Sequence, residues 1–246
     1  MTMDPVGWTG VVRANAGMLT AAARRAGVDA AVVTCPKWTV ADLCAHVGNV
    51  HRWVTAIVGD QSQQNPGFPS PSDPPEDPVA WVEEGVDQLL AVLESADPDG
   101  RVWNWASPDP EPARFWYRRM AHETVIHRVD AESAVPVAGR VEPAELAADG
   151  LDELFGMLPA RVARQKRMAE LVGSYHFHTT DTEGEWVVDF ADGAVTVARE
   201  HAKRPVAVRG PASALELFVY HRGPADEVEV LGDDSLMGAW HDHVRF

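Results

Sequence analysis

FWYRRMAHETVIHRVD, residues 115–130, places ionisable side chains where a helix normally carries its core. Spacings of 4, 3, 4, 3 and 4 residues, the rhythm of one inward-facing helical stripe, separate Trp116, Met120, Glu123, His127, Asp130 and Ala134. Burying such groups without partners costs several kcal/mol. We therefore expect a bound metal, a catalytic network or a fully hydrogen-bonded polar core on this helix.

The composition predicts a globular, acidic protein. Its 246 residues are 46% hydrophobic and 24% charged, which suits one large domain or two small ones. The net charge of −16 argues against nucleic acid and anionic membranes as partners. Cys35 and Cys44 do not form a CxxC pair, and neither a signal peptide nor an apolar run of about 18 residues is found. We expect a cytoplasmic protein.

The first part of the chain shows helical periodicity throughout. Thr39 and Asp42 have the spacing of a helix N-cap pair, and Gly27 is placed to end the helix before it. A loop at 97–112 holds Trp103 and Trp105, and aromatic residues in such a loop usually cover a core edge or a pocket mouth. The pattern predicts helices at 6–26, 40–59, 78–95, 112–134 and from 143 to before 172, with a long surface loop at 61–78.

The period changes beyond residue 170, where short alternating and β-branched runs begin. These runs predict strands at 175–179, 186–190 and 194–197, followed by helices at 212–220 and 235–241. The fold class is therefore α+β. We place a helical domain at residues 1–170 and a smaller α/β domain at residues 171–246.

Glu123 and His127 are four residues apart and can chelate one ion from a single helix face. The metalloprotease pattern HExxH does not apply, because His122 points about 140° away from His127. Three protein ligands and an open position are typical of a catalytic zinc site. The helix at 40–59 offers His46 and His51 as the third ligand, about 60° and 80° from its apolar centre. This geometry favours His46 only weakly.

Several other polar residues could have either a structural or a functional role. Asp130 could orient a metal ligand or an arginine, or lie exposed. A second metal site at His176 and His178, which share one face of a predicted strand, is conceivable with Asp181 nearby, but we favour a structural or pocket-lining role. We expect Cys44 to carry no catalytic thiol. The arginines that begin the 112–134 helix could hold carboxylates, but pairing with the protein's own acidic residues is the stronger expectation for Arg114, Arg118 and Arg119.

Two motifs resemble a known family. CPKWTVADLCAHVG at 35–48 and RMAHETVIHRVDAE at 119–132 are similar to the mycothiol-dependent maleylpyruvate isomerase family, whose N-terminal domain is a DinB-like four-helix bundle. Residues 208–222 and 228–233 resemble its C-terminal domain, a small α/β module related to sterol-carrier-like folds. The resemblance covers nearly the whole chain.

The resemblance implies particular site residues. In the family a divalent metal, usually zinc, is bound by one histidine of the second helix and by a Glu and His four apart on the fourth, which correspond to His46, Glu123 and His127. An arginine of the C-terminal domain is needed for activity, and Arg222 is the matching residue. This match is looser, because the family shows Gly-Arg where this chain has His221-Arg222-Gly223.

The implied function is that of a metal-dependent, mycothiol-using enzyme. It would be either a cis-trans isomerase of maleylpyruvate-like substrates or a thiol S-transferase acting on an electrophilic small molecule. Its partners would be a small-molecule substrate and a low-molecular-weight thiol. The alternative is a non-catalytic DinB-like protein that binds a metal or ligand in a regulatory role.

Overall fold

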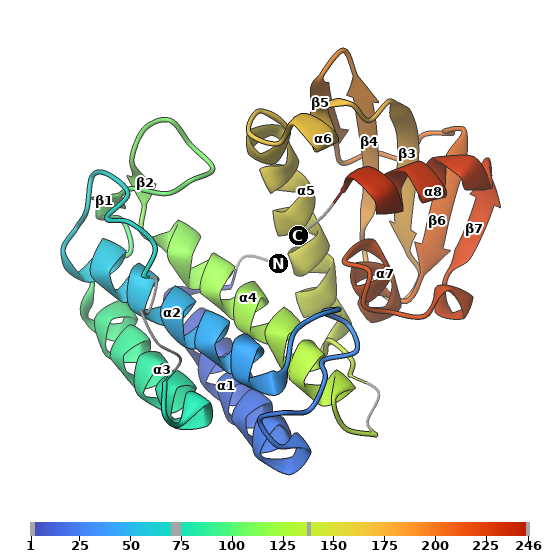
Figure 1. Ribbon diagram of the computed structural model, residues 1–246. Helices are drawn as coiled ribbons and strands as arrows, with labels where there is room; N and C mark the ends of the chain where they lie inside the picture. Colours follow the sequence, from blue (N-terminus) through green and yellow to red (C-terminus); the bar gives the residue numbers. More distant parts are fainter. Residues whose placement is uncertain (1–2, 70–74, 137–138, 245–246) are drawn as a thin grey trace. The chain divides into compact units, whose positions relative to one another are not determined.

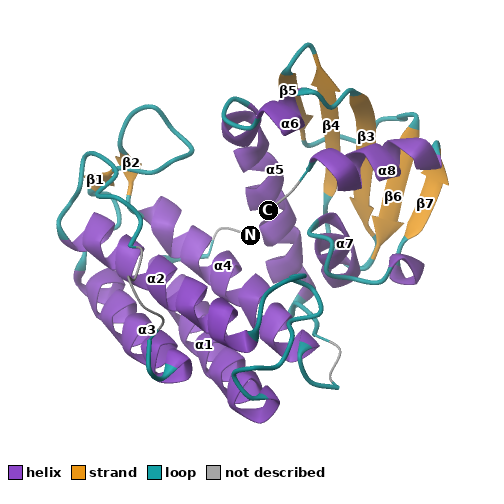
Figure 2. Ribbon diagram, viewed as in Figure 1, coloured by secondary structure: helices purple, strands orange, loops and turns teal. Residues whose placement is uncertain are grey.

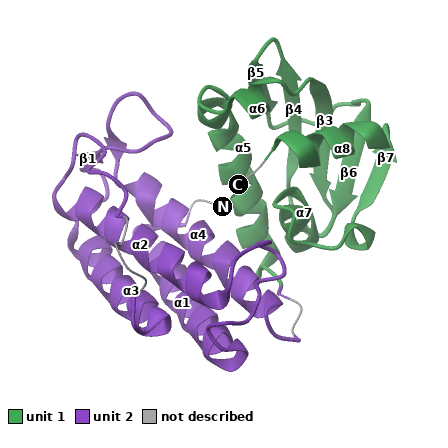
Figure 3. Ribbon diagram, in the orientation of Figure 1, with its two compact units in different colours: residues 1, 140–246 green, residues 2–139 purple. Residues whose placement is uncertain are grey.

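The computed structural model describes residues 3–69, 75–136 and 139–244. The chain forms two compact units that meet in sequence between Gly139 and Arg140 (Figure 3). This position corrects the boundary that we expected near residue 170. The helix after Pro143 contacts the elements of the second unit, and a helical pattern alone does not show which core a helix covers.

The first unit is a bundle of four helices, as expected (Figure 1). Helix α1 contacts α3 and α4, and α2 contacts the same two helices, so the four enclose one core. The predicted boundaries agree with the observed ones to within about two residues. The helices are α1 (Pro5–Ala26), α2 (Val40–Gly59), α3 (Pro78–Ser95) and α4 (Arg114–Ser133).

Local sequence fixes how α2 begins and how closely α3 approaches it. The Thr39 hydroxyl accepts a hydrogen bond from the Asp42 amide, while the Asp42 carboxylate accepts one from the Thr39 amide, which completes a capping box. At Gly48 a Cβ atom would lie only 2.3 Å from the Trp81 ring, so glycine permits this close packing of α2 on α3. The Arg52 guanidinium lies 3.2 Å from the centre of the same ring.

The loop between α3 and α4 contains a short hairpin that the sequence did not predict. Strand β1 (Arg101–Val102) pairs with β2 (Glu111–Pro112) in antiparallel register. Trp103 follows β1 and packs edge-on against Trp53 of α2 at 5.6 Å between ring centres. The Trp103 ring therefore covers an edge of the bundle core, one of the two positions expected for it. The loop predicted at 61–78 lies partly outside the described residues, at 70–74.

The second unit combines helices with a five-stranded sheet, counted over the described residues (Figure 2). The strand order is β5-β4-β3-β6-β7, in which β3 and β6 are parallel and the other pairs antiparallel. Strands β6 and β7 were not predicted. The elements are α5 (Ala144–Val162), α6 (Lys166–Ala169), β3 (Gly173–Thr179), β4 (Glu185–Ala191), β5 (Ala194–Ala198), β6 (Val206–Gly210), α7 (Ala212–Val219), η1 (Ala225–Glu227), β7 (Glu229–Gly232) and α8 (Asp234–His243).

The two faces of this sheet differ in chemistry. On one face Tyr175 and Phe177 pack against Trp240 of α8, and Phe177 also packs against Phe155 of α5. His176 and His178 alternate with these residues and therefore point to the opposite face. The aromatic face forms the core of the unit. In the described part of the chain, no helix has the length and apolar character needed to cross a membrane.

Candidate metal centre

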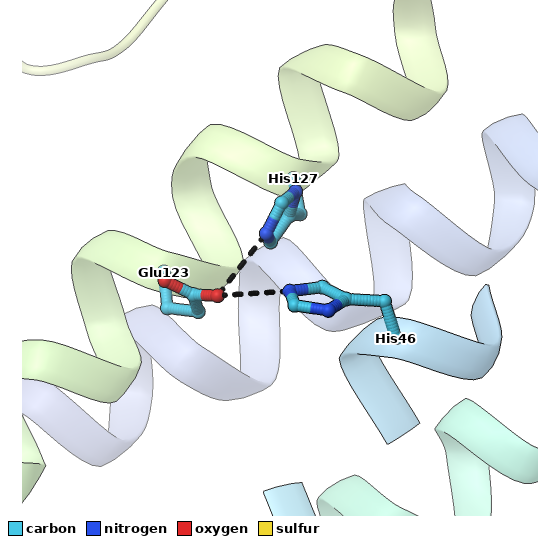
Figure 4. A group of neighbouring side chains, drawn as sticks. All are labelled: His46, Glu123 and His127. Atoms are coloured by element: carbon cyan, nitrogen blue, oxygen red, sulfur yellow. Dashed lines mark hydrogen bonds and ion pairs between the residues drawn. The ribbon is translucent and has the colours of Figure 1, made fainter. Parts of the chain in front are cut away.

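The three residues proposed as metal ligands come together in the bundle (Figure 4). His46 extends from α2 toward α4, and its Nε2 atom lies 3.4 Å from Oε1 of Glu123. His127 follows Glu123 by one helical turn, and its Nε2 atom lies 3.1 Å from the same oxygen. One ligand atom from each of the three residues lies within 4.8 Å of the others. The helical spacing and the two motifs therefore located one cluster in space.

Hydrogen bonds from neighbouring side chains fix the orientation of Glu123 and His127. The Arg119 guanidinium donates to Oε2 of Glu123 at 2.5 Å, which leaves Oε1 facing the two imidazoles. Nδ1 of His127 lies 2.9 Å from Oδ2 of Asp130. The Thr34 hydroxyl donates to the other Asp130 oxygen at 2.6 Å. Asp130 is fully buried, which excludes the exposed alternative, and its carboxylate fixes the ring of His127.

The charges of this cluster shift its pKa values in opposite directions. Burial alone would raise the pKa of Glu123, but Arg119 and His127 overcome it and hold that pKa well below its ordinary value. Burial would lower the pKa of His127, but the Glu123 carboxylate and the hydrogen bond to Asp130 raise it to about 9. The metal-free cluster therefore pairs a carboxylate with an imidazolium.

The donor set fits a divalent transition metal. Two imidazoles and one carboxylate are the ligands of many catalytic zinc sites, in which a fourth position stays open. Asp130 holds Nδ1 of His127, so the deprotonated ring would present Nε2 as its ligand atom on the side of Glu123. The two imidazole nitrogens lie 3.4 and 3.1 Å from Oε1 of Glu123, and all three ligand atoms lie within 4.8 Å of one another, a spacing that one ion could bridge. Small side-chain movements would complete coordination.

Aromatic rings border the cluster. The Trp38 ring stacks on His127 at 6.4 Å between centres and lies 5.1 Å from His46. The Phe68 ring lies 6.4 Å from His46 and is half exposed. Among these contacts, sequence reasoning assigned no role to Trp38, Phe68 or Thr34. The motif at 35–48 contained Trp38, but this residue lies before the first turn of α2, where helical periodicity does not predict which way a side chain points.

The remaining polar residues of the bundle lie apart from the three ligand atoms. His51 is fully buried beside Thr124, with its Nε2 atom 3.3 Å from the threonine hydroxyl, and burial lowers its pKa to about 4. His122 packs edge-on against Trp8, away from His127 as predicted. Burial raises the pKa of Cys44 to about 12, which agrees with the expectation of no catalytic thiol. Arg114 pairs with Asp99, so this arginine is used within the protein.

Arg222 belongs to the second unit and follows α7. Its guanidinium donates to the Tyr220 carbonyl at 2.7 Å and lies 5.7 Å from the centre of the Tyr220 ring. The preceding His221 has a positive φ of 64°, which turns the chain sharply at the end of the helix. Arg222 is thus anchored by a local turn, and its catalytic role remains a prediction.

The fold and this cluster define a class of two-unit proteins that combine a helical bundle with a small α/β unit. Residues 11–132 match the family described as the mycothiol maleylpyruvate isomerase N-terminal domain, and residues 145–239 match its C-terminal domain. The chain belongs to the mycothiol-dependent maleylpyruvate isomerase family.

Solved structures agree with this assignment. The crystal structure of the mycothiol-dependent maleylpyruvate isomerase is similar with a TM-score of 0.61 and 15% identity, over the full length of both chains. A crystal structure of a mutant of that enzyme, in which a histidine is replaced by alanine, is similar with a TM-score of 0.60 and 14% identity, again over the full length of both chains. At these identities the likeness shows the fold. No curated protein sequence matches the chain.

Proposed function

We propose that the protein is a metal-dependent enzyme that uses mycothiol to isomerise a maleylpyruvate-like substrate. The observation that carries this proposal is the convergence of His46, Glu123 and His127, whose ligand atoms lie within 4.8 Å of one another. Membership of the family and the full-length likeness to a mycothiol-dependent isomerase support it. Zinc is the ion that we expect, because the donor set matches its preferences.

The metal and the thiol would supply complementary chemistry. A zinc ion with an open position lowers the pKa of a bound thiol, so that thiolate is present at neutral pH. Reversible addition of such a thiolate to a conjugated cis double bond leaves a single bond that can rotate before elimination restores the thiol and the trans double bond. An S-transferase would keep the adduct instead.

The protein's own residues prepare the site for this chemistry. Arg119 holds one oxygen of Glu123, which fixes the other toward His46 and His127. Asp130 holds the Nδ1 proton of His127 and thereby selects the ring nitrogen that faces Glu123. The Trp38 ring packs beside both histidines and would shield that side of the cluster from water. These contacts preorganise the ligands.

Arg222 is proposed as a catalytic residue of the same reaction. A guanidinium group binds carboxylates through paired N–H donors, and a maleylpyruvate-like substrate carries carboxylates. We expect Arg222→Lys to raise KM and to lower kcat while zinc content stays unchanged, because Arg222 is not a metal ligand. An unchanged kcat/KM in this variant would remove Arg222 from the mechanism.

The function is tested by measuring metal content and thiol-dependent turnover of the purified protein. Bound zinc is quantified, and mycothiol is then supplied with maleylpyruvate or with a thiol-reactive electrophile. Isomerisation without net loss of thiol supports the proposal. Consumption of one thiol per product would identify an S-transferase, and zinc without any thiol-dependent turnover would favour a non-catalytic binding protein.

A further inference from the structure

The second unit carries another histidine and carboxylate cluster, on the polar face of its sheet. His176 and His178 lie on β3, and Glu185 on β4 is the direct cross-strand partner of His178. His201 belongs to residues 199–205, which connect β5 to β6. Ligand atoms of His176, Glu185 and His201 all lie within 4.8 Å of one another. Three segments that are separate in sequence therefore converge on one carboxylate.

The topology explains why His201 reaches this face. Strands β5 and β6 both run parallel to β3 but lie on opposite sides of it, so the connection must return along the sheet. It is held at two points on the polar face. Nδ1 of His201 lies 3.0 Å from Oε2 of Glu185, and the Arg204 guanidinium donates to Asp189 at 3.1 and 3.2 Å. The connection thus lies across the face that carries His176.

A buried nitrogen in this cluster has no hydrogen-bond partner. The His176 side chain is only 7% exposed, and its Nε2 atom makes no hydrogen bond to any described residue. This atom lies 3.9 Å from Oε2 of Glu185, and the His176 ring is 5.2 Å from the His201 ring between centres. An orphaned polar atom in a folded protein calls for a ligand or a water molecule. Here it points at a carboxylate and a second imidazole.

The Glu185 carboxylate lies close to three imidazole rings. Its oxygens lie 3.0 to 3.9 Å from ring nitrogens of His176, His178 and His201. Imidazole and carboxylate together suit zinc, nickel and copper ions, whereas calcium and magnesium prefer oxygen ligands alone. The chemistry of the cluster therefore selects a divalent transition metal.

Solvent and ions can reach the cluster from one side. A surface pocket of about 590 Å³ is lined by residues that include His178, Glu183, Glu185 and Glu200. His178 thus lines a pocket, one of the two roles favoured for the pair His176 and His178, whereas His176 is not among the lining residues. The lining also contains Arg199, which pairs with Asp152 at 2.8 Å, so the three carboxylates make the pocket attractive to cations. Asp181, considered as the carboxylate partner, instead accepts a hydrogen bond from the Ala212 amide at the start of α7.

We propose that His176, Glu185 and His201 form a second divalent transition-metal site, which fastens the 199–205 connection to the sheet. The ligands would be Nε2 of His176, a carboxylate oxygen of Glu185 and a ring nitrogen of His201. Of these three ligands, Glu185 also lines the pocket beside His178. This site is independent of the bundle centre, since it shares no ligand with it.

The test counts metal ions bound by the full-length protein. Metal-free protein is titrated with zinc chloride in a calorimeter, and cobalt chloride is used in parallel for its visible absorption. The wild type should bind two equivalents, and His201→Ala should bind one. His201 is 75% exposed, so its removal leaves the core intact. Lys203→Ala, which changes the same connection without removing a ligand, should still bind two equivalents.

A second pair of variants makes the sites distinguishable. Glu123→Ala should keep one equivalent through the sheet site, and Glu123→Ala combined with His201→Ala should bind none. Cobalt bound to the Glu123→Ala variant should give the strong visible bands of a four-coordinate site, and these should vanish on adding His201→Ala. Two equivalents retained by His201→Ala, or a wild type with a single equivalent that depends only on Glu123, would overturn the proposal. If the wild type bound a single equivalent that disappears in His201→Ala, the bundle would bind no metal. That result would contradict the proposed function but support the sheet site.

Discussion

The bundle cluster and the sheet cluster contain the same chemical groups but are supported differently. Each brings two imidazoles and one carboxylate within 4.8 Å. In the bundle all ligands stand on regular helices, and the Glu123 side chain is 19% exposed and pairs with Arg119. In the sheet cluster one ligand, His201, stands on a connection between strands and is 75% exposed. The bundle cluster is therefore the more preorganised of the two.

This difference indicates separate roles for the two clusters. A site whose ligands are fixed before binding loses little conformational entropy when an ion enters, so its affinity is high. A site with one ligand on an exposed connection must order that segment, and its metal mainly adds a cross-link to the fold. We expect the bundle to bind zinc more tightly than the sheet. The following predictions would break or sharpen this contrast.

Removing a ligand of the bundle cluster should have the largest effect. Loss of a residue that orients a ligand lowers metal affinity by up to roughly 100-fold. We expect Glu123→Ala and His127→Ala each to lower the zinc affinity of the bundle by more than that. Thiol-dependent turnover should disappear with the metal. The measurement is zinc content after dialysis against a weak chelator, together with the turnover rate.

The control for this experiment is Glu132→Gln, which removes another carboxylate of α4. Glu132 pairs with Arg128 and does not touch the cluster, so zinc should be retained. Full zinc occupancy of the bundle in either ligand variant would refute the ligand assignment.

Asp130→Asn should have a smaller effect than loss of a ligand. Asn keeps the shape of the side chain but no longer offers a carboxylate to Nδ1 of His127, which lies 2.9 Å away. Such a change typically costs about 10- to 100-fold in metal affinity. Competition with a coloured zinc chelator measures this change. An Asp130→Asn variant as weak as His127→Ala would mean that Asp130 is itself a ligand, and unchanged affinity would show that orientation of the ring does not matter.

The metal-free bundle should become less stable as the pH rises above neutrality. The pKa of His127 is about 9 in the folded protein and about 6.5 in an unfolded chain, so its contribution to stability is complete below pH 6.5 and is lost as the pH rises through 9. Between pH 7 and 9 the loss amounts to about 2 kcal/mol. Urea unfolding of chelator-treated protein, followed by tryptophan fluorescence, measures it.

The matched variant for this pH series is His127→Gln, which should unfold with a flatter dependence over the same range. The titration of His51 does not interfere with this comparison. Its pKa of about 4 lies below that of the unfolded chain, so its contribution is present above pH 6.5 and is lost as the pH falls toward 4. If the free energy of unfolding decreased equally with pH in the wild type and in the variant, His127 would not bind the proton assigned to it.

The sequence predicted the bundle cluster better than the sheet cluster for a physical reason. Glu123 and His127 lie four residues apart on one helix, so periodicity alone placed them together. Choosing His46 over His51 required the family resemblance, because rotation about a helix axis is poorly fixed by its apolar pattern. Glu185 was missed as the partner of His178, since strand register is set by long-range pairing. His201 lies outside every strand and gave no signal.

The lack of long-range information in the sequence pattern also explains the misplaced boundary between the two units. Helix α5 has an ordinary amphipathic pattern, and Phe155 on its buried face looks like any core residue. Only the structure shows that this ring packs on Phe177 of β3 and Trp186 of β4. Capping signals were more reliable, because a cap such as Thr39 depends on residues within three positions of it.

That locality leads to the smallest predicted effect, for Thr39→Ala. Losing the cap should destabilise the protein by about 1 kcal/mol in urea unfolding. Thr55→Ala, on the same helix but without a capping role, should cost less. Zinc affinity of the bundle should change little, because His46 lies two turns beyond the cap on a helix that packs along α3 and α4. A large loss of zinc affinity in Thr39→Ala would show that the bundle cluster depends on a local segment, as we propose for the sheet cluster, and the contrast between the two would fail.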